Sequence, residues 1–169
     1  MTAPLNRGEV SRLRRGMIEC MDPAELERRM IALKSPYGDD SNDAARSLGR
    51  AAIASAIPAL AAALCHDAAW EHTDSACVKA EAIATIGGEA AIATLVGLLL
   101  KYDLEAHEDA NGDVSDKSWR VHHACVHGLV QIGRLAIPAL HPLLQHTNRR
   151  AAQSAAEALE KLGAGDFRP

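Results

Sequence analysis

Aromatic residues are scarce in this chain, at 3 % of 169 residues. Runs of valine, isoleucine, threonine and tyrosine, which are typical of strands, are nearly absent as well. Hydrophobic residues nevertheless make up 48 % of the sequence, and alanine supplies much of that share. A core of alanine, leucine and isoleucine with few rings favours closely packed helices. The length suits one compact domain or one short repeat array, so we expect an all-α fold.

Several features of secreted and membrane proteins are also missing. The cysteines form no C-x-x-C pair, and the first residues lack a signal-peptide pattern. The longest apolar run, residues 90–100, is too short to span a bilayer. A net charge of −4 gives no support for a basic nucleic-acid-binding face. We expect a cytoplasmic protein that binds neither membranes nor nucleic acid. Its cysteines are expected to be buried or free thiols, namely Cys20, Cys65, Cys77 and Cys125.

One apolar pattern with the spacing +3 and +4 occurs three times, and each set marks one stripe of a helix. The sets are Ile57, Leu60 and Leu64; Ile92, Leu95 and Leu99; and Ile137, Leu140 and Leu144. An earlier helix precedes each set, with the marker residues Leu48, Ile83 and Leu129, and a fourth copy follows at Leu159. These markers stand 35, 46 and 30 residues apart. The pattern predicts stacked helical hairpins, each made of a first and a second helix.

Glycine and proline occupy the positions that turns between these helices require. Gly87 and Gly133 follow first helices, where a left-handed conformation ends a helix. Pro58 and Pro138 stand near the start of second helices, where a missing N–H costs nothing. Near the N-terminus, the Asp-Pro pair that begins at Asp22 predicts the N-cap of a further helix.

The repeating stretches resemble a known architecture. The sequences VKAEAIATIGGEAAIATLVGLL (78–99) and ACVHGLVQIGRLAIPALHPLL (124–144) resemble the short HEAT-like repeats of the phycobilisome-lyase type. The resemblance implies an α-α superhelix (solenoid) of about four to five stacked hairpins, with second helices lining the concave side. On this basis residues 1–40 form a divergent capping hairpin and residues 41–163 the repeats, with an acidic insertion at 103–119. Residues 164–169 form a C-terminal tail.

The histidines near residue 125 raise the question of a metal site. His123 and His127 share one helical face. When the repeats are aligned, the column of His127 holds charged residues in other units, namely Arg46, Glu81 and Glu157. We therefore expect these histidines on a polar stripe that faces solvent on the convex side. The alternative is a metal pair completed by His122 or Cys125, but Cys125 points to a different face from His127. We predict neither a metal nor a cofactor.

Two enzyme families resemble this repeat class but lack support in the residues. Deoxyhypusine hydroxylases hold two irons with His-Glu dipeptides, whereas the nearest position here reads His123-Ala124 and the preceding unit Cys77-Val78. HEAT-like alkylpurine DNA glycosylases use a cationic, aromatic-lined groove, whereas this chain is acidic. Phycobilin lyase activity is supported by the repeat alone. The sequence therefore does not favour an enzyme.

Other cationic residues are candidates for binding. His141 stands in a column that otherwise holds Ala61 and Val96, so it is either a partly buried group with a hydrogen-bond partner or part of a binding face. Pro142 follows it and predicts a kink. A second column, at the C-terminal ends of successive second helices, holds His66, Lys101 and His146. These cations either balance the helix dipoles or form a ridge that meets acidic groups of a partner.

The insertion from Asp103 to Trp119 carries six acidic residues and one lysine. It matches a calcium loop only in part, because Val114 replaces the required glycine and Arg120 the final glutamate. The alternatives are a solvated acidic loop and a loop that contacts a partner. Its candidate contact residues are Asp109, Asp113 and Asp116. In the shorter loop before residue 77, Trp70 is expected to fold over the edge of the hydrophobic stack.

No nucleophile, base and orienting group converge in the sequence. It therefore favours a non-enzymatic protein–protein interaction module, an adaptor or assembly scaffold. The partner is expected to contact the concave helix face and the acidic insertion, and to carry a basic patch of opposite charge. One alternative is a neutralising inhibitor such as a bacterial toxin immunity protein. Another is a metal-dependent enzyme that uses the histidines.

Overall fold

The computed structural model describes residues 21–35, 37–70, 72–102 and 117–164, and every regular element within these ranges is a helix. The α-helices and 3₁₀-helices (η) are α2 (Pro23–Ala32), α3 (Gly38–Arg50), η1 (Ala54–Ala56), α4 (Ile57–Ala69), α5 (Thr73–Ile86), α6 (Gly88–Lys101), α7 (Lys117–Ile132), η2 (Gly133–Ala136), α8 (Ile137–Leu140), η3 (His141–Gln145) and α9 (Arg149–Lys161). The all-α prediction is therefore confirmed over these ranges. Within them, no helix combines the length and apolar character that crossing a bilayer requires.

The residues expected to start and end helices do so. Asp22 caps α2, and its Oδ1 accepts a backbone N–H from the first turn. Gly87 and Gly133 directly follow α5 and α7, with φ angles of 72° and 80°. Glycine reaches such left-handed angles without steric cost. Pro58 and Pro138 occupy the first turns of α4 and α8, where no helical N–H bond is lost.

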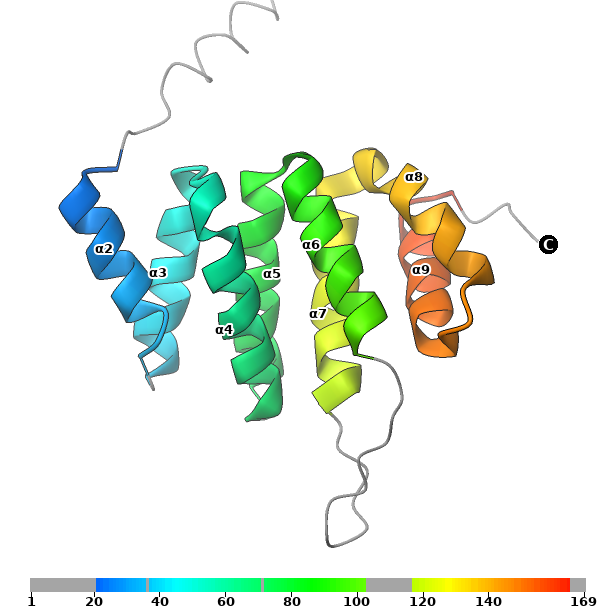
Figure 1. Cartoon of the computed structure of the whole chain (residues 1–169), viewed down its shortest axis with the longest axis horizontal. Coiled ribbons are helices and arrows are strands. Elements are labelled where there is room, and N and C mark those ends of the chain that lie inside the picture. The colour runs from blue at the N-terminus through cyan, green and yellow to red at the C-terminus, as the bar shows by residue number, and fades with distance from the viewer. Residues whose placement is uncertain (1–20, 36, 71, 103–116, 165–169) are drawn as a thin grey trace, which may run out of the picture.

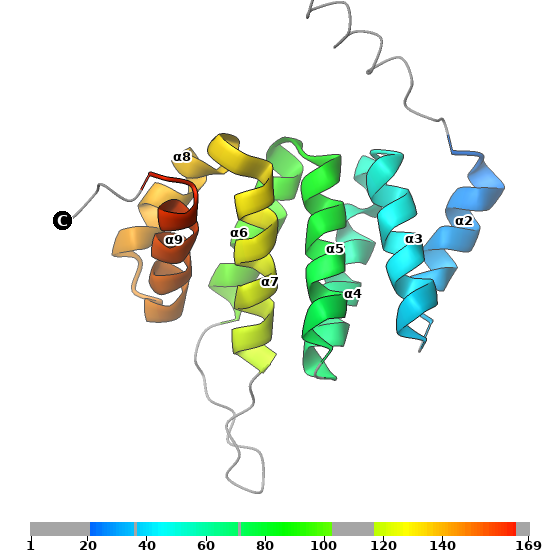
Figure 2. The same cartoon turned by 180° about the vertical axis from the view of Figure 1, so that it is seen from behind.

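The helices form two layers, which Figure 1 and Figure 2 show from opposite sides. The first helices α3, α5, α7 and α9 form one layer, in which each packs on the next. The second helices, α4, α6 and the α8–η3 pair, lie on the other side of this layer. α2 packs on α3 at one end of the array. The second helices α4 and α6 and the helix η3 end at the lower end in Figure 1, where the first helices α5, α7 and α9 begin.

The predicted apolar stripes form the core between the layers. The marker residues Leu48, Ile83 and Leu129 are fully buried, and Leu159 is nearly so. The second helices contribute further fully buried side chains, namely Leu60, Leu64, Leu95, Leu99 and Leu140. Burying one such side chain contributes roughly 1.5–3 kcal/mol. The two layers thus stabilise each other, because each covers the apolar stripe of the other.

The last second helix departs from the predicted register. α8 ends at Leu140, and the chain continues as the 3₁₀-helix η3. Pro142 has no N–H to donate and its ring crowds the preceding turn, so the expected break occurs here. Because a 3₁₀-helix has about three residues per turn, Leu143 follows Leu140 into the core, while Leu144 is only half-buried. Leu143 is therefore the buried core residue of this turn, and the predicted core residue Leu144 packs against the core from a partly buried position.

Two glycines bring the first helices close together. A Cβ atom on Gly49 of α3 would lie 3.0 Å from the Cα atom of Ala82 in α5. A Cβ atom on Gly128 of α7 would lie 2.9 Å from Cδ1 of Leu95 and 3.0 Å from the carbonyl oxygen of Ala80. These gaps leave no room for a methyl group. Contacts between neighbouring first helices are also more extensive than those between α4 and α6.

Two predictions about the tryptophans are wrong. The sequence places Trp119 in the insertion, whereas α7 begins at Lys117 and includes Trp119 in its first turn. The inserted segment that lies outside the described residues is therefore 103–116. Trp70 is the C-cap residue of α4 and is 65 % exposed rather than folded over the hydrophobic stack. The small side chain of Ala68, which is fully buried, fills this end of the core instead.

Candidate interaction surfaces

A hollow crosses the layer of first helices. Its lining residues come from three successive helices: Arg46, Gly49 and Arg50 of α3; Val78, Glu81, Ala82 and Thr85 of α5; and Gln131 of α7. Because α3 and α7 both line a hollow that lies over the helix between them, this layer is concave at α5. The close contact of Gly49 with Ala82 leaves no long side chain to fill it.

A second hollow continues the first across α7. Glu81 and Gln131 line both hollows, and His127, Val130 and Lys161 complete the second. Nδ1 of His127 lies 3.7 Å from Oε1 of Glu81, which is an ion pair when the histidine is protonated. We call these connected hollows the first-helix groove. The polar stripe expected on a convex face therefore lines a groove. The HEAT-like resemblance implies that second helices line the hollow side, whereas this groove lies on first helices.

A smaller hollow, the Trp119 groove, lies between the N-terminal turns of α7 and α9. It is lined by Trp119, His122 and His123 of α7 and by Arg150, Gln153, Ser154 and Glu157 of α9. The ring of Trp119 stacks on His123, with centroids 5.3 Å apart and 17° between the planes. Its volume is about 90 Å3. Small-molecule sites typically span roughly 300–1,000 Å3, so this groove suits a protruding side chain.

The tyrosines and tryptophans of the chain stand at helix ends, and these ends all lie at the lower end of the molecule in Figure 1. Tyr37 precedes α3, Trp70 and Tyr102 follow α4 and α6, and Trp119 lies in the first turn of α7. Tyr37, Trp70 and Trp119 are 72 %, 65 % and 47 % exposed. Nη1 of Arg120 donates to a backbone carbonyl of α4 at 3.2 Å, so the start of α7 contacts the end of α4. We call these four rings the aromatic edge. Exposed aromatic side chains are enriched in protein interfaces.

The predicted cationic column lies at the same end of the molecule. The ring of His66 lies 6.3 Å from that of Trp70, centroid to centroid. Lys101 is the last residue of α6, and its Nζ lies 5.8 Å from the ring centre of Tyr102. His146 follows η3, and its Nδ1 accepts a backbone N–H at 3.1 Å. Of this column, His66 and Lys101 therefore lie beside rings of the aromatic edge.

Among the remaining predicted site residues, His141 does not line the grooves described above. His141 is the first residue of η3 and is half-buried, so its role stays a prediction. The predicted acidic contact residues lie outside the described residues, namely Asp109, Asp113 and Asp116. Free thiols are found, as predicted, at the described cysteines Cys65, Cys77 and Cys125. Burial raises the pKa of Cys77 and, more strongly, that of Cys125.

His122, for which the sequence suggests no role, connects three helices. Its buried ring places Nε2 2.6 Å from the carbonyl oxygen of Tyr102 and Nδ1 2.8 Å from Oγ of Ser154. Because a carbonyl oxygen only accepts, Nε2 carries a proton and donates it. The hydroxyl of Ser118 donates to the same carbonyl at 3.1 Å. These bonds satisfy a carbonyl at the end of α6 and fix one wall of the Trp119 groove.

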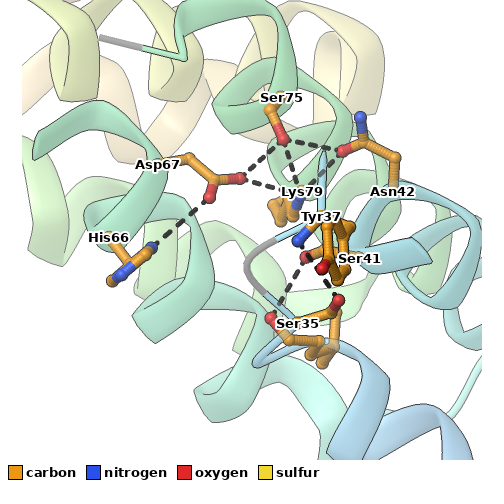
Figure 3. A network of polar contacts seen from close by, with 9 residues as sticks. Ser35, Tyr37, Ser41, Asn42, His66, Asp67, Ser75 and Lys79 are labelled. Carbon is orange, nitrogen blue, oxygen red and sulfur yellow. Dashed lines mark hydrogen bonds and ion pairs between the residues drawn. The ribbon is translucent and has the colours of Figure 1, made fainter. Parts of the chain in front are cut away.

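Lys79 is fully buried where α3, α4 and α5 meet, as Figure 3 shows. Its Nζ lies 2.7 Å from Oδ2 of Asp67, 2.7 Å from Oδ1 of Asn42 and 2.8 Å from Oγ of Ser75. Each N–H of the ammonium group therefore has one acceptor. The Ser75 hydroxyl also lies 2.7 Å from the same carboxylate oxygen and 2.8 Å from the amide oxygen. Sequence reasoning missed this cluster.

The contacts of this cluster indicate a structural role. Burial lowers the pKa of Lys79, and the hydrogen bond and charge of Asp67 oppose this shift. A serine beside a lysine also occurs in nucleophilic catalysis. Here the lysine is enclosed and ion-paired, and none of the hollows described above is lined by Ser75. A substrate therefore has no route to the hydroxyl through these hollows, and the four side chains bind three helices together.

Comparison with known proteins adds no function to these surfaces. No protein-family model matches the sequence, and no curated protein matches it either. Across the part of the chain that the structure describes, no three side chains of histidine, cysteine, aspartate or glutamate are grouped so that they could hold a metal ion.

Proposed function

We propose that this chain is a non-enzymatic protein-binding module, an adaptor or assembly scaffold built as a HEAT-like α-α superhelix. The repeated hairpins, their shared buried columns and the hollow layer of first helices support this architecture. Arrays of this kind offer extended concave surfaces to their partners. Rigid helices also lower the ordering cost of binding.

The main support for the proposal is that the two grooves adjoin each other and end at the aromatic edge. The first-helix groove and the Trp119 groove are both lined by α7 and α9. Nζ of Lys161, in the first groove, lies 2.7 Å from Oε1 of Glu157, in the second. Trp119 then stands at the open end of this path, on the aromatic edge. A partner that follows the path meets polar side chains first and exposed rings last.

The partner's charge was predicted from the acidic segment 103–116. That segment joins Tyr102 to Lys117 and so starts and ends at the aromatic edge. A basic patch on the partner would face it, and opposite charges would speed association. This part of the proposal depends on residues that the structure does not describe.

The proposal is tested by affinity capture from the native host with three forms of the full chain as bait. These are the wild type, an edge variant (Trp70→Ala with Trp119→Ala) and a control variant (Leu135→Ala). The control removes an apolar side chain of η2 that is 74 % exposed away from the edge. We expect one partner to be retained by the wild type and the control and lost by the edge variant, because buried aromatic anchors dominate binding energy.

The readout is the amount of each captured protein relative to the wild type. Circular dichroism of the three baits verifies that they are equally helical. Equal capture by the edge variant and the wild type would refute the aromatic edge as the contact surface. Failure of all three baits to retain any protein would refute the binding function itself.

A further inference from the structure

Cations at the aromatic edge stand where helix electrostatics disfavour them. Lys117 is the first residue of α7, and Arg149 and Arg150 are the first residues of α9. Neither helix has an acidic residue in its first turn. By contrast α2, α5 and α6 each have one there and α3 has two. The N-terminal end of a helix carries partial positive charge, so cations there are repelled and an anion is attracted.

Within the described residues, these cations have no carboxylate as an ion-pair partner. Across the described residues, Lys101, Lys117, Arg149 and Arg150 form no ion pair, whereas Arg28, Arg29, Arg46 and Lys161 each do. The nearby carboxylates are already engaged: Glu157 with Lys161, and Asp67 with Lys79. The edge between α6, α7 and α9 therefore has unbalanced positive charge in the described part of the chain.

The two N-terminal turns face one another across the Trp119 groove. Residues of the first two turns of α7 and of α9 line it together, including Trp119 and Arg150. The hydrogen bond between His122 and Ser154, at 2.8 Å, fixes the two helices side by side. One small groove thus has two helix N-termini, a guanidinium group and an exposed indole ring around it.

An unsatisfied donor is buried at the N-terminus of α9. Asn148 is the N-cap of α9, and its Oδ1 accepts the N–H of Ala151 at 2.8 Å. Its Nδ2 is buried without a hydrogen-bond partner, and the residue is only 4 % exposed. Buried donors in folded proteins are nearly always paired. An acceptor that docks at this helix end would supply the missing partner after a small shift of the amide.

We infer that the Trp119 groove and the cations around it dock an acidic segment of the partner protein. Carboxylates of that segment would lie at the N-terminal turns of α7 and α9, beside Lys117, Arg149 and Arg150. An apolar side chain of the segment would pack on the exposed Trp119 ring. This inference rests on the proposed protein-binding function and assigns it a partner chemistry. The basic patch predicted from segment 103–116 would then be a separate feature of the same partner.

The inference is tested by fluorescence anisotropy with the full chain and three labelled probes. The first is a short peptide in which glutamates alternate with leucine and phenylalanine, and the second has glutamines in place of the glutamates. The third is an oligothymidylate that carries the same charge as the first. We expect the glutamate peptide to bind at least about tenfold more tightly than either other probe, and increasingly weakly with added salt.

Matched variants locate the binding site. Lys117→Gln with Arg150→Gln is expected to weaken binding of the glutamate peptide at least about tenfold. Arg134→Gln removes a cation of η2 that also forms no described ion pair, at the opposite end of the molecule and outside both grooves, and is expected to leave affinity unchanged. Circular dichroism verifies that both variants are folded.

Several results would overturn the inference. These are equal binding of the glutamate and glutamine peptides, wild-type affinity in the edge variant, tighter binding of the oligothymidylate, and no binding of any probe. None of them bears on the capture of a partner by the wild-type chain. The partner chemistry and the proposed function can therefore fail separately.

Discussion

Nζ of Lys79 and Oδ2 of Asp67 lie 2.7 Å apart at the junction of α4 and α5. The lysine is fully enclosed and the carboxylate is 13 % exposed. A buried ion pair is weak evidence for stability by itself, because removing two charges from water offsets most of their attraction. Breaking the pair is costly, however, because the remaining charge stays buried.

This asymmetry gives the first prediction. Asp67→Asn is expected to reduce the free energy of unfolding by about 3–5 kcal/mol, because it leaves the Lys79 ammonium buried without a counter-charge. The double variant Lys79→Met with Asp67→Leu, which removes both charges, is expected to stay within about 1 kcal/mol of the wild type or to exceed it. Urea unfolding measures the free energy of unfolding of both variants. An Asp67→Asn variant as stable as the wild type would show that the pair does not hold the helices.

Gly128 and Gly97 provide a second, paired prediction. A Cβ atom on Gly128 would lie 2.9 Å from Leu95 Cδ1, whereas one on Gly97 would meet nothing within 4 Å. Gly128→Ala is therefore expected to cost about 1–3 kcal/mol through overpacking. Gly97→Ala should stabilise the protein by about 0.5–1 kcal/mol, because alanine favours the helix. Thermal unfolding tests both expectations. Shifts of the melting temperature with the same sign in both variants would refute the close approach of α7 to α5.

The register of α6 gives a third prediction. Leu95 is fully buried, whereas Leu100, on the same helix, is 37 % exposed. Leu95→Asp is expected to abolish cooperative folding, because a carboxylate would enter the core between the layers. Leu100→Asp should cost no more than about 1 kcal/mol, including the unfavourable charge near a helix C-terminus. A soluble, cooperatively unfolding Leu95→Asp variant would refute the register.

A pH dependence follows from Cys125. Burial raises the pKa of its thiol well above the ordinary value, so the folded state holds this proton more tightly than the unfolded state. Its contribution to stability is therefore fully present below the unfolded pKa of about 9 and is lost as pH rises above it. The difference in the free energy of unfolding between the wild type and Cys125→Ala should become smaller as the pH is raised from neutral to alkaline. Val126→Ala, a cavity variant without a titrating group in the same helix, should keep a constant difference.

Much of the fold could be predicted because it depends on local spacing. The markers Leu48, Ile83 and Leu129 and the turn glycines were sufficient to place the hairpins. The shift from Leu144 to Leu143 was not predicted, because it depends on a change from α- to 3₁₀-helical spacing after Pro142. The sequence predicted a change in the helix at Pro142. It did not predict which of the following leucines would be buried.

The polar core could not be predicted from spacing alone, because its partners are distant in sequence. Lys79 contacts Asn42, which lies 37 residues away. A signal was nevertheless present: the repeat column of Lys79 otherwise holds small residues, namely Ala44, Cys125 and Ala155. His122 likewise stands in a column with Ala76 and Ala152. A polar residue in a column of small ones was the sign of a buried, paired group.

The groove on the layer of first helices also escaped sequence reasoning. It depends on how closely the helices within each layer approach, and that distance is set by contacts such as Gly49 with Ala82. The exposure of Trp70 and Trp119 was missed for a related reason. The exposure of both rings follows from where α4 ends and where α7 begins. These ends lie in segments whose apolar residues show little helical periodicity.

The central claim, that a partner binds along the first-helix groove and the aromatic edge, is tested most directly by site-specific photocrosslinking in the native host. Benzoylphenylalanine is introduced at Trp119 on the edge, at Thr85 in the groove, or at Leu135, which is exposed away from both. We predict one adduct of the same mass from the first two positions and none from Leu135. Adducts from Leu135 alone, or from none of the three positions, would contradict the account.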